Sequence, residues 1–415
     1  MKVINGNVVS PKGFKACGNA IGLKKNNNDG NTGLRPNKKD MAIITSDVPA
    51  NAAGCFTTNI VKAAPVHWDM GNVENSISGI VINSGNANAC TGKQGMKDAE
   101  DTAEKLASLM STKAENILVC STGVIGVNLP MNTILNGIDS TYPLLSSDIE
   151  SGNSAAEAIM TTDTYAKTVA VETEINGKTV TIGGMAKGSG MINPNMATML
   201  CFITTDCYIS KAMLHKALKS CVKDTFNMIS VDGDMSTNDT VLCLANGLAE
   251  NEKINTQNED FTKFKEALKY VCKKLAIACA DDGEGATKLI EAKVTGAVDK
   301  DSARKIALSV VSSSLLKAAI FGEDANWGRV LCAMGYSGAD FDPMGVTIKF
   351  RSENGEILLM DKGTPIVFDE ELAAKILSAH IIYIDMILDE GTSESTAWGC
   401  DLTYDYVKIN GDYRS

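Results

Sequence analysis

The chain is poor in the residues on which several common kinds of active site depend. Only three histidines occur among its 415 residues, at His67, His215 and His380, and they are far apart in the sequence. Neither a Ser-His-Asp triad nor a histidine-rich metal site is favoured, because each needs histidine at defined positions. We predict no metal and no cofactor, and we expect the three histidines to be surface or packed side chains.

Paired cysteine motifs and long apolar runs are also missing. Twelve cysteines are scattered from Cys17 to Cys400 without a C-x-x-C pair, which is typical of reduced thiols in a large intracellular protein. The longest apolar stretch, near residues 381–388, is too short to cross a bilayer, and residues 1–7 lack the apolar core of a signal peptide. These absences predict a cytoplasmic location.

Positive charge is scarce and aromatic residues are few. The chain has 39 basic against 50 acidic residues, a formal net charge of -11, and 5% aromatic residues. We find no stripe of lysine and arginine interleaved with aromatics, so nucleic-acid binding is not favoured. A small-molecule substrate is the better expectation, and 44% apolar residues suffice for a large core.

The apolar residues follow strand and helix periods in alternation, which predicts a mixed α/β fold arranged in layers. Expected strands lie at 77–82, 116–120, 167–173, 178–182, 198–204, 289–294, 346–350, 357–360, 381–387 and 397–403. Expected helices lie at 96–110, 148–160, 211–228, 261–280, 302–318 and 370–378, with Asp301 in the N-cap region of the fifth. Asn176-Gly177 and Asn354-Gly355 each predict a hairpin turn.

A glycine-rich segment, residues 183–190, runs from the first hairpin toward Thr198, which opens an apolar stretch. It fits neither G-x-G-x-x-G nor G-x-x-x-x-G-K-[ST], so nucleotide binding is not favoured. If the bond between Ala197 and Thr198 breaks, Thr198 gains a free α-amine beside its hydroxyl, giving nucleophile and base in one residue. A plain loop before an ordinary strand is the simpler interpretation, and the pattern alone leaves both open.

Eight segments in order along the chain resemble the ornithine acetyltransferase family, also called glutamate N-acetyltransferase. They are NSGNANACTG (83–92), STGVIG (121–126), TTDT (161–164), KGSGMINPNMATML (187–200), DGDMSTND (232–239), GEGATK (283–288), GEDANWGR (322–329) and NGDYRS (410–415). The chain departs from the usual family residues at Ala166, Met235, Ala325 and Ser415. None of these departures falls on the nucleophile or on the oxyanion pair that the resemblance implies.

The resemblance implies a precursor that cleaves itself between Ala197 and Thr198 into an alpha chain, 1–197, and a beta chain, 198–415. The two are expected to be intertwined in one globular unit with the layered architecture of N-terminal-nucleophile enzymes and the family's own connectivity. Thr198 is implied to be the nucleophile, with Thr122 and Gly123 as the oxyanion hole. The implied substrate-binding residues are Thr161, Lys187, Thr198, Glu284, Asn410 and Ser415.

The implied reaction moves an acetyl group from N2-acetylornithine to glutamate by a ping-pong mechanism, as a step of arginine biosynthesis. Acetyl-CoA as a further acetyl donor is left open. A heterotetramer of two alpha and two beta chains is expected from the same resemblance. Two alternatives remain: a hydrolase or aminopeptidase that uses the same N-terminal threonine, and a non-catalytic binding protein whose loop stays uncut.

Overall fold

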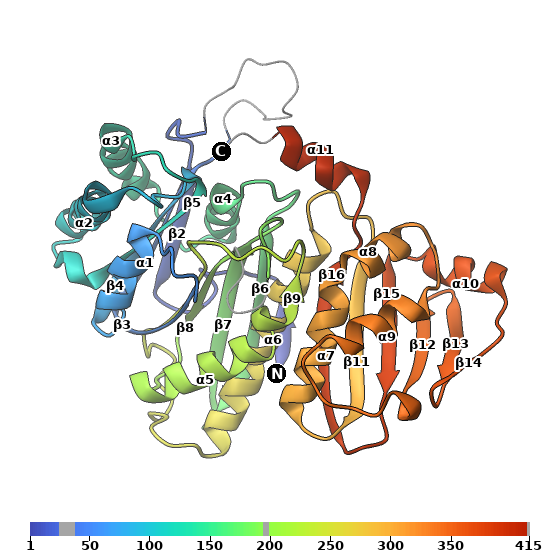
Figure 1. Ribbon diagram of the computed structural model, residues 1–415. Coiled ribbons are helices and arrows are strands. Elements are labelled where there is room, and N and C mark those ends of the chain that lie inside the picture. The colour runs from blue at the N-terminus through green and yellow to red at the C-terminus, as the bar shows by residue number, and fades with distance from the viewer. Residues whose placement is uncertain (25–37, 194–198, 413–415) are drawn as a thin grey trace.

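The computed structural model describes residues 1–24, 38–193 and 199–412. Within these ranges the chain folds into two mixed β-sheets flanked by helices, a larger sheet of nine strands and a smaller one of seven (Figure 1). The predicted α/β class is confirmed. The two sheets share one large apolar core that takes residues from both, so they belong to a single packed body.

The larger sheet has the strand order β1-β6-β7-β8-β10-β3-β4-β5, with β2 paired to β3. Its strands are β1 Lys2–Ile4, β2 Phe14–Asn19, β3 Met41–Phe56, β4 Ser76–Asn86, β5 Ile117–Val124, β6 Lys167–Ile175, β7 Lys178–Lys187, β8 Leu200–Thr205 and β10 Thr240–Ala245. β8 runs antiparallel to β7 and parallel to β10, which in turn pairs with β3. Strands from after residue 198 therefore lie between strands from before it.

The hairpin of β6 and β7 forms where the sequence predicts it. Asn176 and Gly177 both have positive φ, 51° and 70°, which suits a tight two-residue turn. The two strands pair continuously from Ile175 with Lys178 to Lys167 with Ala186. This register brings the two ends of the hairpin, and the lysines they carry, to the same end of the sheet.

Helices cover both faces of the larger sheet. The flanking helices are α1 Ala64–Asn72, α2 Gly92–Leu109, α3 Met131–Thr141, α4 Ile149–Ile159, α5 Lys211–Lys223 and α6 Glu259–Asp281. Along β8, Cys201 and Ile203 face the core that contains α5 and α6, whereas Leu200 and Phe202 face the core that contains α4. This alternation is that of a strand buried on both faces. α6 packs on β6 and β7 and also on the smaller sheet.

The smaller sheet has the order β14-β13-β12-β15-β11-β16-β9. Its strands are β9 Ile229–Ser230, β11 Leu289–Ala297, β12 Thr347–Ser352, β13 Gly355–Asp361, β14 Thr364–Pro365, β15 Ile381–Ile387 and β16 Ser393–Cys400. The helices of this part are α7 Lys300–Ser312, α8 Ser314–Phe321, α9 Trp327–Gly335, α10 Glu370–Leu377 and α11 Tyr404–Asp412. α11 lies at the upper end of the molecule, on the side of the larger sheet's loops (Figure 1).

Three element predictions need correction. The helix predicted over 302–318 is two helices, because the Ser313 hydroxyl accepts a hydrogen bond from the amide of Leu316 and starts α8. The N-cap of the first of them, α7, is Asp299, whose carboxylate accepts a hydrogen bond from the Ser302 amide. Asp301, the predicted cap, lies in the first turn of α7. The helix predicted to reach residue 228 ends at Lys223, and a short 3₁₀ turn follows.

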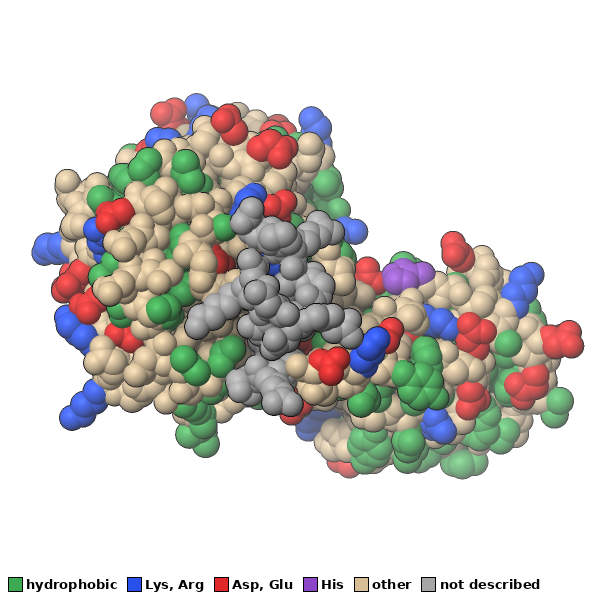
Figure 2. Space-filling model, turned by 90° about the horizontal axis from the view of Figure 1, so that it is seen from above, with side chains coloured by type: hydrophobic (Ala, Val, Ile, Leu, Met, Phe, Trp, Pro, Cys, Tyr) green, Lys and Arg blue, Asp and Glu red, His purple; other side chains and the backbone are tan. Residues whose placement is uncertain are grey.

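Acidic and basic side chains are interspersed over the face of the molecule seen from above (Figure 2). Among the helices of the described ranges, none combines the length and the apolar character needed to cross a membrane. The twelve cysteines are all free thiols.

Candidate active site

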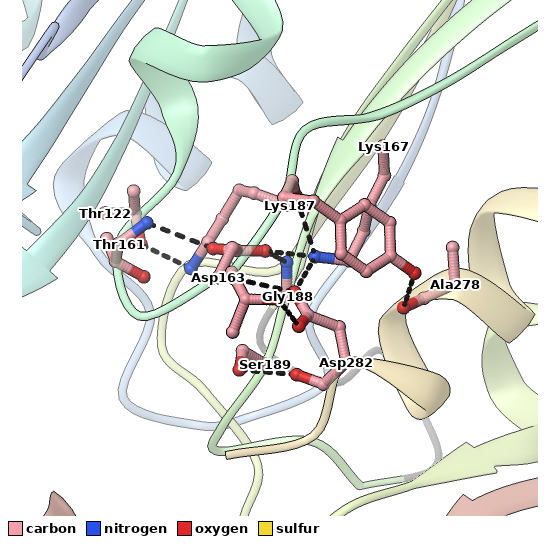
Figure 3. Close-up of polar contacts among 11 residues, drawn as sticks. Thr122, Thr161, Asp163, Lys167, Lys187, Gly188, Ser189, Ala278 and Asp282 are labelled. Carbon is pink, nitrogen blue, oxygen red and sulfur yellow. Dashed lines mark hydrogen bonds and ion pairs between the residues drawn. The ribbon is translucent and has the colours of Figure 1, made fainter. Parts of the chain in front are cut away.

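Two residues from distant parts of the sequence meet at the loop end of the larger sheet. Lys187 is the last residue of β7, and Thr122 lies near the end of β5. The Lys187 Nζ donates a hydrogen bond of 3.3 Å to the Thr122 Oγ1 (Figure 3). Both residues are buried, with exposed fractions of 3% and 4%. The structure thus brings together a predicted substrate residue and a predicted oxyanion residue.

Gly123 adopts a backbone conformation that only glycine tolerates at this position. Its φ is +134°, and an added Cβ would lie 2.3 Å from the carbonyl carbon of Gly85 on the paired strand β4. A side chain there would have to push two backbones apart. The Asn238 amide further fixes this strand end, because its Nδ2 donates 2.8 Å to the Ser121 carbonyl oxygen.

Thr161 is held at the same place by a buried carboxylate that the sequence prediction missed. Asp163 accepts hydrogen bonds from the backbone amides of Thr161, at 3.0 Å, and of Gly188, at 2.7 Å. Its Oδ1 also accepts 2.7 Å from the Lys167 Nζ. Burial raises the pKa of Asp163, but Lys167 and Lys187 outweigh it and bring the pKa to about 2. Asp163 is therefore ionised.

A second buried carboxylate shares the same lysine. The Lys167 Nζ lies 2.6 Å from Asp282 Oδ2, and both side chains are almost completely buried (Figure 3). Burial lowers the pKa of Lys167, but Asp163 and the surrounding groups raise it above its usual value. Asp282 also accepts from the amide of Thr164 at 3.0 Å. We call Asp163, Lys167 and Asp282 the Lys167 triad.

Lys187 differs from Lys167 in its partners. Among the described residues its ammonium hydrogen-bonds the neutral Thr122 hydroxyl and forms no ion pair within 4 Å. Burial lowers the pKa of Lys187, against the opposing attraction of Asp163. A buried cation with a neutral partner is suited to receive an anionic group.

Glu284 and Asn410 meet beside the glycine segment that follows β7. The Asn410 Nδ2 donates 2.7 Å to Glu284 Oε2, and the Glu284 amide donates 2.9 Å to the Ser189 carbonyl oxygen. The carboxylate lies so close to Gly190 that a Cβ there would come within 2.4 Å of its carboxyl carbon. The predicted substrate residues that the structure describes thus fall into two groups, one at Thr122 and one at Glu284, joined by the segment 187–190.

One more acidic residue contacts the residue that follows the predicted nucleophile in the sequence. Asp239 Oδ1 accepts 3.0 Å from the amide of Met199, the residue after Thr198, and burial raises the pKa of Asp239 well above its usual value. Asp163 and Asp239 stand inside the quoted segments 161–164 and 232–239, so their sequence signal was present. Lys167 and Asp282 lie outside every quoted segment, and only the tertiary structure identifies them.

Three of the predicted site residues, Ala197, Thr198 and Ser415, lie outside the described residues. The prediction of the cleavage site therefore stays a prediction. Within the described ranges, no group of three or more histidine, cysteine or acidic side chains is arranged to hold a metal ion.

Comparison with known proteins decides the family. The model of the ArgJ family matches residues 27–415. The chain belongs to the ArgJ family. It is 51% identical over 416 residues to the arginine biosynthesis bifunctional protein ArgJ of Caldanaerobacter subterraneus subsp. tengcongensis, covering 100% of both chains. It is 50% identical over 408 residues to the ArgJ of Thermotoga neapolitana, covering 98% of this chain and 99% of that one.

Two solved ArgJ-type structures are similar to parts of this chain. A crystal structure of the Bacillus halodurans arginine biosynthesis bifunctional protein ArgJ is 46% identical, with a TM-score of 0.49, and covers 51% of this chain and 98% of its own. The Mycobacterium tuberculosis ornithine acetyltransferase, solved with ornithine, is 38% identical, with a TM-score of 0.42, over 46% of this chain and 97% of its own. The predicted family and its acyltransferase class are confirmed by the full-length ArgJ relatives.

Proposed function

We propose that this ArgJ-family enzyme transfers the acetyl group of N2-acetylornithine to glutamate through an acetyl ester on Thr198. The observation that carries the proposal is the meeting of Lys187 and Thr122, at 3.3 Å, in a buried position. Two residues predicted separately for substrate binding and for oxyanion stabilisation share one hydrogen bond. The full-length identity to arginine biosynthesis proteins supports the same reaction.

The proposed first half-reaction forms the acetyl enzyme. The Thr198 hydroxyl oxygen attacks the acetyl carbonyl carbon, and the α-amine of Thr198 takes the hydroxyl proton. Thr122 and Gly123 donate to the oxygen that becomes negative. When the tetrahedral intermediate collapses, the bond from the acetyl carbon to the ornithine nitrogen breaks, the nitrogen receives the proton, and ornithine leaves.

The second half-reaction reverses these steps with glutamate. Its amine attacks the ester carbonyl, the bond to the Thr198 oxygen breaks, and N-acetylglutamate leaves while Thr198 recovers its proton. Because the Lys187 ammonium only donates, the Thr122 oxygen accepts from it and the Thr122 proton remains free to point at the oxyanion. This arrangement supports the role proposed for Thr122.

Charge complementarity supports the proposed substrate contacts. Lys187 is suited to the substrate carboxylate, and Glu284, held by Asn410, to the side-chain ammonium of ornithine. Thr161 and Ser415 complete the proposed set. Replacing Glu284 with Gln should lower kcat/KM for acetylornithine far more than for an acetylated amino acid with an uncharged side chain. Equal losses for both donors would refute the assignment.

We also propose that Thr198 becomes N-terminal by self-cleavage after Ala197, leaving chains 1–197 and 198–415. The strand order supports continued association, because β8 and β10 of the later segment pair with β7 and β3 of the earlier one. Two chains of each kind are proposed to assemble as a heterotetramer. Denaturing electrophoresis should show two fragments of nearly equal size, and a single band near 44.0 kDa would contradict cleavage.

The covalent step has a direct test. Incubation with labelled acetylornithine alone should add one acetyl mass to the chain that starts at Thr198, and an unmodified chain would exclude the acetyl enzyme. Turnover that rises with glutamate supports the transferase, whereas turnover indifferent to any amine supports the hydrolase alternative. Glutamate acetylation with acetyl-CoA as sole donor would decide whether the chain has the second donor that a bifunctional enzyme implies.

A further inference from the structure

Two buried lysines lie at the same end of the β6–β7 hairpin but have different partners. Lys167 opposes Ala186 in the strand register, one residue before Lys187. Lys167 contacts two carboxylates, at 2.7 and 2.6 Å, while Lys187 contacts the neutral Thr122 hydroxyl at 3.3 Å. Figure 3 shows the two ammonium groups on either side of Asp163.

We propose that Lys167 is a positioning residue. By forming the ion pair with Asp163, Lys167 leaves the Lys187 ammonium free to bind an anionic group of the substrate. The inference rests on the proposed function, because it assigns Lys187 to the substrate carboxylate. It adds that the freedom of Lys187 is maintained by a residue that touches neither substrate nor the oxyanion pair.

Asp163 is the carboxylate with which Lys187 would form an ion pair if Lys167 were absent. It is already bonded to the backbone of the neighbouring residue, because the Gly188 amide donates 2.7 Å to its Oδ1. That same oxygen accepts 2.7 Å from Lys167. Since a buried carboxylate needs a cation or strong donors, removing Lys167 leaves Asp163 to pair with Lys187.

Asp282 makes this arrangement neutral overall. Two lysines, Lys167 and Lys187, face two aspartates, Asp163 and Asp282, but both aspartates are bonded to Lys167. Asp282 also ties the triad to the Glu284 side of the site, because its own carbonyl oxygen accepts 2.6 Å from the Ser189 hydroxyl. The uneven sharing of charge, rather than its total, leaves Lys187 without a carboxylate partner among the residues that the structure describes.

The proposal predicts how substrate binding depends on pH. The titratable groups that act on Lys187 come from several elements and are Asp163, Lys167, Cys279, Asp239 and Lys24. An ammonium that binds a carboxylate is lost as pH rises through its pKa. If Asp163 pairs with Lys187, the pKa of Lys187 rises, and kcat/KM then decreases only at a higher pH. Removing the Asp163 charge lowers the pKa of Lys187, so that kcat/KM decreases at a lower pH.

The experiment compares a charge-balanced double variant of the full chain with a single variant as its control, with N2-acetylornithine as donor. Lys167→Met with Asp282→Asn keeps one aspartate and one lysine and frees Asp163 for Lys187, while Asp282→Asn alone keeps Lys167 on Asp163 and is the control. We expect KM for acetylornithine to be at least tenfold higher in the double variant than in the control, with kcat changed less. The high-pH fall should move up by at least one pH unit in the double variant and down in Asp163→Asn.

Equal KM and equal pH profiles in the double variant and its control would overturn the inference. If the double variant has no cooperative melting transition, Lys167→Arg and Asp163→Asn decide: the profile should stay in place in the first and move down in the second. An unmoved or upward profile in Asp163→Asn would then overturn it. Wild-type enzyme without any acetylornithine turnover would instead refute the proposed function, and the inference with it.

Discussion

The larger and the smaller sheet share one large apolar core but differ in how deeply their ion pairs are buried. At the loop end of the larger sheet, Asp163, Lys167, Lys187 and Asp282 are buried together. In the smaller sheet the ion pairs Arg351–Asp385 and Lys293–Glu394 lie in partly exposed positions. Burying ions costs far more than leaving them in water. Among the ion pairs between described residues, only those of Lys167 have both side chains almost completely buried, and they lie where the proposed chemistry takes place.

The largest effect is expected at Thr198, the predicted nucleophile. Thr198→Ala should lower kcat by at least about 10³-fold and leave the precursor as one band, because both cleavage and acetyl transfer need the hydroxyl. Thr198→Ser is the matched control, since it keeps a hydroxyl at the same atom, and it should retain cleavage. If the Thr198→Ala enzyme were uncut but fully active, Thr198 would not be the nucleophile, and the loop end of the larger sheet would not be the site of acetyl transfer.

Gly123→Ala should come next. The new Cβ would meet the Gly85 backbone at 2.3 Å, displace the oxyanion pair and lower kcat by about 10²-fold. Gly126→Ala is the control, because Gly126 also has positive φ, at +82°, but has open space around its Cα. Steady-state kinetics on both variants separates the steric effect from backbone strain. Equal losses in the two variants would show that strain alone matters.

Asp163 predicts a pH dependence of stability. Its folded pKa of about 2 lies below the usual value of 3.8, so its contribution is present above pH 4 and is lost as pH falls toward 2. The shift corresponds to about 2 kcal/mol of unfolding free energy. Urea titrations from pH 5 to pH 2.5 should show a smaller loss in Asp163→Asn than in wild type. Parallel losses would exclude the carboxylate as a source of stability.

The smallest effect is expected in the smaller sheet. Lys293→Met removes a partly exposed pair with Glu394, so unfolding free energy should change by less than about 1 kcal/mol. Acetyl transfer should be as fast as in wild type. Urea unfolding and the acetylornithine assay check the two statements. A tenfold loss of activity would break the contrast between the two sheets.

Local signals in the sequence predicted much of the fold. Asn176-Gly177 marks the turn between β6 and β7 because it meets a conformational demand within two residues. The end of the helix after Ser302 was missed because Ser313 starts a new helix inside a continuing apolar pattern. Periodicity reports a buried face, and two consecutive helices can share that face.

The site was predicted only as far as motif segments reach. Thr122, Lys187, Glu284 and Asn410 were named from such segments, and the structure places them in two neighbouring groups. The role of Lys167 was not predicted, because Lys167 is the first residue of a strand whose pattern predicts only a hairpin. Asp282 follows a long helix, where an acidic residue attracts no notice. Their roles depend on an ion pair between residues 115 positions apart, which no local pattern contains.

The interleaving of β8 and β10 between β7 and β3 has a consequence for how the enzyme could be made. Two separately synthesised halves would each expose unpaired strand edges, and the correct sheet would need a bimolecular encounter of two incomplete chains. In a single polypeptide the two halves are covalently linked, so that they meet within one molecule at a high effective concentration. Under the proposed cleavage, a split gene should therefore give less active enzyme than the intact gene, at a yield that rises with the concentration of both halves.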